Sequence, residues 1–421
     1  MSTTILVIGL MVFFAHFLSL QFRKTNIPDV LVLMLVGIVI GPVLGIVTPD
    51  DFGKIGSLIA TIALVVILFE SGTSLNITTL GESLGTTGLL TTACFVFTGL
   101  IVAIMGFAVM GLELLPATLL GMILGGTSSA VVIPMVNSLG LSEKPATVLV
   151  LESALSDVLC IVGVFALLQI YTQGGVEPGR LIGSVLSALI FAAVIGVVGG
   201  IGWLLVLGKV RDFPNTISST LAYVFIVYGA TEFLGFSGAI AALALGITLT
   251  NFEKFGLHHI PSIDRNIEPL NKMDLDFYRE AVFLLKTYFF VYLGISIHFG
   301  AAELALMAVA MVLLVYVMRL GLTRMVFRNE SYGLRDAAIT SMLAPKGLAA
   351  AVLAALPLQY GVAGGEVIRD TTYMVVLVSI TLTAVLVMLY PVPQVRRFYS
   401  FALGKQPGDT LKVAAYKPPQ E

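Results

Sequence analysis

The sequence predicts an all-α polytopic membrane protein of about thirteen transmembrane helices. Two observations lead to this fold class: 57% of the 421 residues are hydrophobic, and only 11% are charged, whereas soluble domains carry roughly 25% charged residues. The 23 basic and 25 acidic residues nearly balance, so the net charge gives no sign of a nucleic-acid partner. This much apolar surface cannot be hidden in a soluble fold, and a bilayer is the environment that suits it.

Thirteen apolar runs are long enough, or nearly long enough, to cross a bilayer as helices, which takes about 20 mostly apolar residues. The first run lacks the basic start and the cleavage site of a removed signal, so we expect it to be retained as a span. The charged stretch 251–280 is expected to be a loop, either without regular structure or with an interfacial helix. The runs lie near 4–21, 28–47, 55–71, 84–110, 114–138, 146–171, 181–207, 216–234, 236–250, 281–299, 301–323, 334–357 and 371–391.

The basic residues predict the orientation of these spans. With thirteen spans, the loops and tail on one side hold 17 of the 23 lysines and arginines, the other side holds three, and three lie within spans. Positive charge stays on the cytoplasmic side of a membrane, so we expect an inner-membrane protein with its N-terminus outside and its C-terminus in the cytoplasm.

Residues 1–391 are expected to form one transmembrane domain, and 392–421 a short, flexible cytoplasmic tail. The sequence contains no nucleotide-binding loop of the G-x-G-x-x-G or Walker type. An ion gradient is therefore expected to drive any transport, and no cofactor is implied beyond transported ions.

The run near 146–171 places two acids inside one span, in the segment ESALSD. An ionisable side chain in a bilayer costs several kcal/mol, so it suggests a function. Asp157, with Ser153 and Ser156 beside it, is interpreted as a carboxylate that binds either a monovalent cation or a proton, because burial disfavours an unpaired carboxylate. The alternative is a structural aspartate that caps a broken helix or pairs with a lysine.

Glu152 lies about 140° around the helix from Asp157, so the two acids are expected to have different partners. For Glu152 we favour a buried ion pair with Arg319 over a direct part in transport. Lys286 is interpreted as a counter-charge opposite Asp157, or else as a lysine that reaches the interface. Glu70 either lines the ion route or marks the end of its span.

Two spans carry signs of interruption, GGTSSAVVIP at 125–134 and APKGLAAAVLAALP at 344–357. Paired interruptions indicate inverted repeats whose two discontinuous helices cross at the midplane and offer oxygen atoms to ions. Lys346 is expected to neutralise the negative helix ends at the crossing, or else to reach the interface. In the first segment, the residues expected to bind the ion are Gly125, Gly126, Thr127, Ser128 and Ser129. The alternative for this segment is a face of small residues that packs against another helix.

These motifs resemble the monovalent cation/proton antiporter superfamily over nearly the whole membrane portion. IPDVLVLMLVGIVIGP, with Pro28 to Pro42, resembles the second span of that family, ESALSD resembles its E-S-x-x-N-D signature, and APKGLAAA resembles its GPRG segment. The resemblance places Asp157 at the ion-binding aspartate, Glu152 and Arg319 at the family's acid and arginine pair, and Lys286 at the basic position of span ten.

The resemblance implies a homodimer in which a six-helix core, including the spans near 84–171 and 281–357, moves like an elevator against a dimerisation domain formed by the other spans. It implies exchange of Na⁺ or K⁺ for H⁺ at Asp157. A single acid in the motif favours one cation per proton. Ser156 replaces the asparagine of the signature, and Ser128 with Ser129 replaces an aspartate and a proline of many sodium exchangers, so the sequence leaves the choice between Na⁺ and K⁺ open.

Three other functions are alternatives to cation/proton exchange. A sodium-coupled symporter of an organic anion on a related fold is the main alternative, and Asp157 argues against it. Neither a G-x-G-D pair nor an H-E-x-x-H site is present, so no enzyme activity is expected. The sequence also lacks the repeated filter motifs of a channel. The expected partners are a monovalent cation, the proton, membrane lipid and a second copy of the chain.

Overall fold

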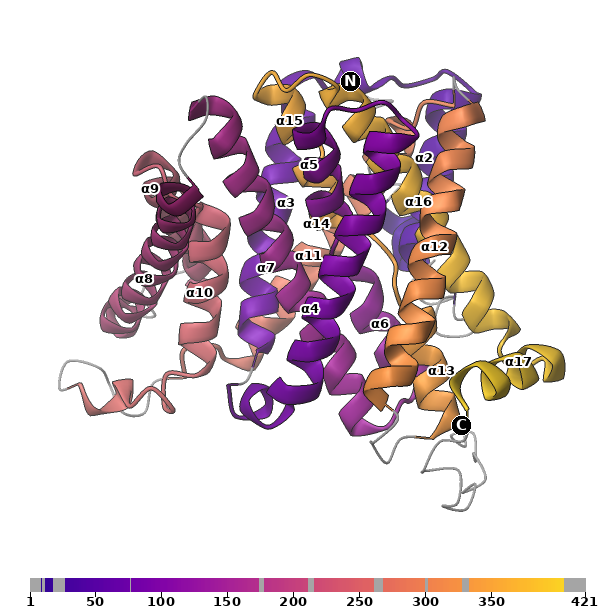
Figure 1. Ribbon diagram of the computed structural model, residues 1–421. Helices are drawn as coiled ribbons and strands as arrows, with labels where there is room; N and C mark the ends of the chain where they lie inside the picture. Colours follow the sequence, from indigo (N-terminus) through magenta and orange to yellow (C-terminus); the bar gives the residue numbers. More distant parts are fainter. Residues whose placement is uncertain are drawn as a thin grey trace.

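The computed structural model describes residues 9, 12–17, 27–75, 77–173, 178–210, 216–260, 268–299, 302–327 and 333–404. In this part of the chain all regular secondary structure is helical, which confirms the predicted all-α class (Figure 1). The helices are α2 (Asp29–Ile38, continued by the π-helical turn Val39–Val43), α3 (Gly53–Ser74), α4 (Ile77–Ala108), α5 (Leu114–Leu124), α6 (Ser129–Leu139), α7 (Glu143–Gln173), α8 (Pro178–Val210), α9 (Ser219–Phe233), α10 (Gly238–Thr250), α11 (Lys272–Ile295), α12 (Ala302–Phe327), α13 (Leu334–Met342), α14 (Leu348–Leu353), α15 (Leu356–Gln359), α16 (Gly365–Leu389) and α17 (Pro393–Leu403).

Six helical segments are long and apolar enough to cross a membrane, and four shorter apolar segments accompany them within the described residues. The chain is therefore a multi-pass membrane protein by length and composition, while the number thirteen stays a prediction. The first predicted span, near 4–21, lies largely outside the described residues. α11 begins at Lys272, before the predicted start near 281, because Asn271 and Asp274 form a capping box in which each side chain accepts a hydrogen bond from the other residue's backbone N–H.

The helices pack in two groups. α2, α3, α8, α9, α10 and α11 pack mainly on one another, while α4 to α7, α12, α13, α14 and α16 form a second group. In Figure 1, α8, α9 and α10 lie together at one edge and α12 and α16 lie toward the opposite edge. α11 packs against α2 and α3, and α16 packs against α12, α5 and α14.

Glycines allow the closest helix contacts in the first group. A Cβ atom on Gly37 of α2 would overlap the carbonyl oxygen of Val291 in α11, and a Cβ on Gly294 of α11 would overlap the carbonyl oxygen of Met34. Small residues let transmembrane helices approach backbone to backbone. The α2–α11 contact therefore depends on these two glycines.

Both predicted interruptions are present as breaks in the helices. Residues 125–128 separate α5 from α6, and residues 343–347 separate α13 from α14. Pro345 lacks an N–H and restricts the residue before it, which ends α13. The backbone N–H of Ser128 donates a hydrogen bond of 2.7 Å to the carbonyl oxygen of Pro345. The two breaks thus lie in direct contact.

The prediction of a flexible tail is wrong for residues 393–403, because these residues form the helix α17. Pro393 occupies the first turn, where its fixed φ angle favours a helix and its missing N–H costs nothing. Tyr399 and Leu403 are buried, so α17 is anchored to the rest of the protein. Residues 405–421 of the tail lie outside the described residues.

Candidate functional site

Asp157 lies in α7 beside the start of α6, with 6% of its surface exposed. The hydroxyl of Ser129, the first residue of α6, donates a hydrogen bond of 3.0 Å to its Oδ2 atom. Within the described residues no basic side chain forms an ion pair with it. In the described part of the chain, Asp157 is therefore a buried acid supported by a hydroxyl and by no counter-charge.

A cavity of about 10 Å³ adjoins the Asp157 carboxyl group. This volume holds roughly one water-sized particle. Its wall combines oxygen-bearing side chains from the start of α6 and from α7 with apolar side chains from α3 and α14: Leu64, Ile67, Leu68, Ser128, Ser129, Asp157, Leu348 and Ala349.

Ser128 contributes a buried hydroxyl to this cavity. Among the residues that the structure describes, its Oγ atom has no hydrogen-bond partner, and an unsatisfied buried hydroxyl costs about 1–3 kcal/mol. The side chain lies against Gly347, where any Cβ atom would overlap it. Glycine at 347 thus leaves the room that the Ser128 side chain occupies.

Two other predicted ion-binding residues, Thr127 and Ser156, hold the interrupted segment to α7, while a third, Ser153, bonds within α7. The Ser156 hydroxyl accepts a hydrogen bond from the Thr127 N–H (3.0 Å) and donates one to the Ser153 carbonyl oxygen (3.1 Å). The Ser153 hydroxyl donates to the carbonyl oxygen of Val150 (2.8 Å). These contacts fix the backbone at 125–128 next to Asp157, and the Ser156 hydroxyl already donates to a protein partner.

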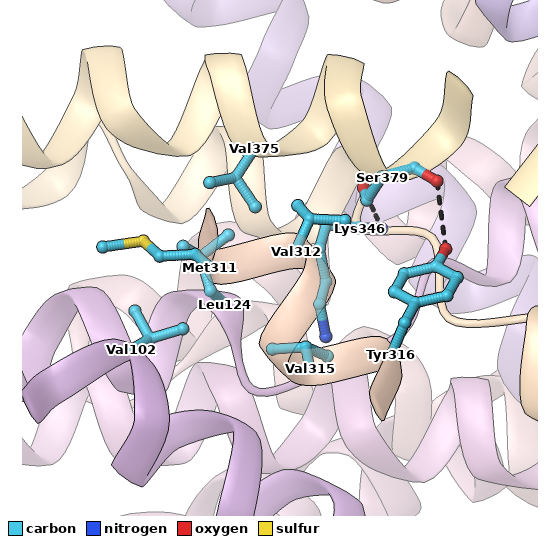
Figure 2. Close-up of a pocket in the computed structure, with 9 residues that line it drawn as sticks. All are labelled: Val102, Leu124, Met311, Val312, Val315, Tyr316, Lys346, Val375 and Ser379. Atoms are coloured by element: carbon cyan, nitrogen blue, oxygen red, sulfur yellow. Dashed lines mark hydrogen bonds between the residues drawn. The ribbon is translucent and has the colours of Figure 1, made fainter. Parts of the chain in front are cut away.

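Lys346 lies at the interrupted end of α5. Its Nζ donates a hydrogen bond of 2.7 Å to the carbonyl oxygen of Gly126, and its backbone N–H donates to the Ser379 hydroxyl at 2.9 Å. Figure 2 shows the side chain extended beside Val312 and Val315, with its nitrogen directed away from Ser379. The positive charge thus lies where the last carbonyl groups of a half-helix concentrate negative charge.

Glu152 and Arg319 form a closed, fully buried pair. Two guanidinium nitrogens donate to the two carboxylate oxygens, at 2.5 and 2.8 Å, and Nε donates to the carbonyl oxygen of Thr340 at 3.0 Å. Bidentate contacts of this kind are among the strongest side-chain hydrogen bonds. The structure therefore brings together the two residues that the sequence paired, and links α7, α12 and α13 through them.

Lys286 has a different partner from the one expected. Its Nζ lies 3.0 Å from Oδ2 of Asp29 at the start of α2, so it pairs across the α2–α11 contact rather than with Asp157. The sequence prediction overlooked Asp29, although an acid within the run 28–47 was the available signal. Glu70 in α3 lies within electrostatic reach of Lys286 and Arg279.

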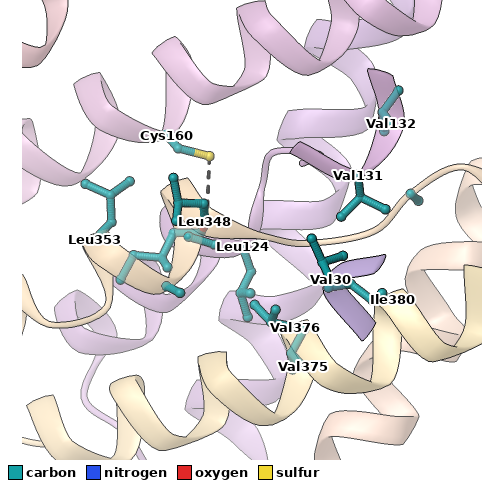
Figure 3. Close-up of a cluster of buried hydrophobic side chains, with 14 of the residues drawn as sticks. Val30, Leu124, Val131, Val132, Cys160, Leu348, Leu353, Val375, Val376 and Ile380 are labelled. Carbon is teal, nitrogen blue, oxygen red and sulfur yellow. Dashed lines mark hydrogen bonds between the residues drawn. The ribbon is translucent and has the colours of Figure 1, made fainter. Parts of the chain in front are cut away.

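Apolar side chains surround the two breaks. Figure 3 shows Leu124 of α5, Val131 of α6, Leu348 of α14 and Val375 of α16 in one buried cluster. Cys160 belongs to the same cluster, and its sulfur accepts a hydrogen bond of 3.1 Å from the Gly126 N–H. This packing excludes water, and charges in such surroundings interact more strongly than in water.

The atoms at the cavity suit a hard cation. The polar side chains there, Ser128, Ser129 and Asp157, offer hydroxyl and carboxyl oxygens, the ligands that cations such as Na⁺ and K⁺ share with other hard ions. No group of three or more histidine, cysteine, aspartate or glutamate side chains that could hold a transition metal occurs in the described part of the chain. The arrangement can bind one small cation or one proton at a time.

Comparison with known proteins places these residues in context. Residues 9–388 match the model of the family described as sodium/hydrogen exchanger, transmembrane. The chain is 24% identical over 372 residues to the K(+)/H(+) antiporter NhaP2 of Shewanella oneidensis, which covers 86% of this chain and 62% of the relative. It is 25% identical over 287 residues to the Na(+)/H(+) antiporter NhaS2 of Synechocystis sp., which covers 68% of this chain and 50% of the relative.

The chain thus spans about half to two thirds of the length of these curated relatives. The solved structure of the sodium proton antiporter MjNhaP1 from Methanocaldococcus jannaschii has a similar fold, with a TM-score of 0.71 at 21% sequence identity, and the match covers 91% of this chain and 99% of that chain.

Proposed function

This chain belongs to the sodium/hydrogen exchanger family, which confirms the resemblance found in its sequence, and we propose that it exchanges Na⁺ or K⁺ for H⁺ across the membrane. The names of its relatives support the reaction class, since one is a K(+)/H(+) and another a Na(+)/H(+) antiporter. The observation that carries the proposal is Asp157, a buried acid beside a cavity of about 10 Å³, without a basic partner among the described residues.

Asp157 holds a proton or a metal ion, and never both. A buried carboxylate without a counter-charge is unfavourable, so it exists as the neutral acid or as the carboxylate with a bound cation. The Ser129 and Ser128 hydroxyls offer two further oxygens to that cation. An arriving cation displaces the proton and the reverse occurs on the other side, so competition for one site couples the two ion movements, which the ion gradients drive.

The proposed stoichiometry is one cation for one proton, which makes exchange electroneutral. Glu152, the other acid of the motif, is held as the carboxylate by Arg319 and cannot take up a proton without leaving a buried arginine unpaired. One acid therefore carries the charge in both half-cycles.

The two packing groups support a proposal of alternating access by an elevator-type movement. We assign α4 to α7, α12 to α14 and α16 to the moving core, because these helices carry Asp157, both breaks and the Glu152–Arg319 pair. The group of α2, α3 and α8 to α11 is the fixed scaffold and the dimer-forming part. The two broken helices are proposed to be corresponding members of inverted repeats that cross at the midplane. We also propose that the protein lies in the inner membrane with its N-terminus outside, and that it catalyses no chemical reaction.

A cavity that holds about one water-sized particle has no room for an organic anion beside the cation. This volume favours the exchanger over the symporter.

The test compares the native chain with Asp157→Asn in liposomes that carry an acid interior and a pH-sensitive dye. Pulses of Na⁺, Li⁺, K⁺ or Rb⁺ should dissipate the pH gradient through the native protein and leave it intact with the variant, because an amide cannot exchange a proton for a cation. Asp51→Asn, which changes an exposed acid in the same way, should behave like the native chain. Equal exchange by Asp157→Asn and the native chain would remove the assignment.

A further inference from the structure

α17 follows directly on the last long apolar helix and has to change direction there. α16 ends at Leu389, Pro391 cannot continue a helix, and Pro393 starts the next one. Figure 1 shows α17 lying across the direction of α16 and α12. Since α16 is long enough to span the membrane, a helix that turns aside at its end lies at the level of the membrane surface.

One face of α17 fixes it to the second helix group. Tyr399 and Leu403 are buried against the protein, and α17 packs on α12 and α13. The Tyr399 ring makes an edge contact with Tyr390 at the end of α16, and Arg324 of α12 donates a hydrogen bond of 3.0 Å to the carbonyl oxygen of Ala402. α17 therefore moves with the helices that carry Asp157.

The remaining surface of α17 is divided into an aromatic face and a basic face. At about 100° per residue, Phe398 and Phe401 lie about 60° apart on one side, and they are 55% and 85% exposed. Arg396 and Arg397 are exposed, and their mean direction lies about 120° from that of the two phenylalanines. No acidic side chain in the described residues pairs with either arginine.

We propose that α17 lies in the headgroup region of the membrane, with Phe398 and Phe401 inserted among the lipid chains and Arg396 and Arg397 bound to anionic phospholipid. Large exposed aromatic side chains beside a basic face are the pattern of helices that lie in the interface and bind anionic membranes. Charge complementarity selects anionic over zwitterionic lipid. Because α17 is attached to the proposed moving core, the anionic lipid bound there regulates exchange, a consequence that rests on the proposed function.

The position of α17 is tested first, independently of transport. The protein used carries Trp203→Phe, which removes the single native tryptophan, and Phe401→Trp. This double variant is reconstituted with phospholipids that are brominated on their acyl chains. Tryptophan at 401 should be strongly quenched. Tryptophan introduced by Ser400→Trp points about 100° away and should be quenched less.

The lipid preference is tested in phosphatidylcholine liposomes with and without phosphatidylglycerol. Phosphatidylglycerol should accelerate exchange by the native chain, and each arginine replaced by glutamine at 396 or 397 should weaken the lipid's apparent affinity about fivefold. Lys144→Gln, which changes an exposed lysine in the first turn of α7, serves as the matched control and should keep the native response.

Equal quenching at 400 and 401, or exchange that ignores phosphatidylglycerol, overturns the inference. Cross-linking of two chains through position 401 with no lipid quenching also overturns it, since the aromatic face is then a contact between copies. Absence of exchange by the native chain in every lipid contradicts the proposed function instead, and the quenching result still decides where α17 lies.

Discussion

Glu152 and Asp157 are five residues apart on α7 and both are buried, yet their surroundings are opposite. Arg319 occupies both oxygens of Glu152 at 2.5 and 2.8 Å, whereas Asp157 receives one hydroxyl from Ser129 and faces a small cavity. A closed ion pair holds three helices together and is costly to open. A buried acid that lacks a counter-charge instead needs a mobile positive charge, so burial alone does not distinguish structure from transport, and the partner does.

Removal of Glu152 should have the largest effect on folding. Glu152→Ala leaves the Arg319 charge buried and unpaired, which costs about 3–5 kcal/mol, so folded yield and melting temperature should fall sharply. The double variant Glu152→Ala/Arg319→Met removes both charges and should recover much of the loss. A normal yield for Glu152→Ala together with lost cation binding would reverse the roles given to the two acids.

Lys346→Met should have an intermediate effect. The change removes the hydrogen bond to the Gly126 carbonyl oxygen but leaves no charge unpaired, so it should cost about 1–3 kcal/mol. The melting temperature, measured in the same detergent, should fall between those of the native chain and Glu152→Ala. A fall in melting temperature as large as that of Glu152→Ala would mean that Lys346 neutralises a buried negative charge and forms a further ion pair.

Ser128→Ala should affect function more than stability. The variant removes a hydroxyl without a partner among the described residues, so the melting temperature should stay the same or rise. The KM for the cation should increase about fivefold to tenfold, since one oxygen ligand contributes about 1–1.5 kcal/mol. Ser156→Ala is the matched control, because its hydroxyl joins the interrupted segment to α7. It should lower the melting temperature, and an unchanged KM in Ser128→Ala would exclude Ser128 from the cation site.

Sequence patterns predicted those features of the site that depend on local chemistry. The acids of ESALSD, the breaks at GGTSS and APKG, and the charge of Arg319 inside an apolar run are each visible without a structure. The free-energy cost of such charged and unpaired polar groups in a membrane is so high that few helix arrangements can provide partners for them. The sequence accordingly predicts the contact between Glu152 and Arg319 and the place of Lys346 at the broken ends, and the structure contains both.

Contacts that depend on how distant helices pack were less accessible. Lys286 has several acids within the membrane portion to choose from, and only the close approach of Gly37 and Gly294 brings Asp29 to it. The donation from Ser129 to Asp157 depends on where α6 begins. α17 was missed because a short amphipathic segment next to a charged tail gives little average hydropathy, although its tyrosine and leucine pack on neighbouring helices.

The most direct test of Asp157 as a shared site counts protons released when a cation binds. Purified protein in weak buffer should release about one proton per chain at saturating Na⁺ or K⁺, with an apparent KM that rises as the pH is lowered, and should release none with choline. Asp157→Asn should release no proton with any of these salts. Equal release from Asp157→Asn and the native chain would show that the exchanged proton resides elsewhere and would contradict the account.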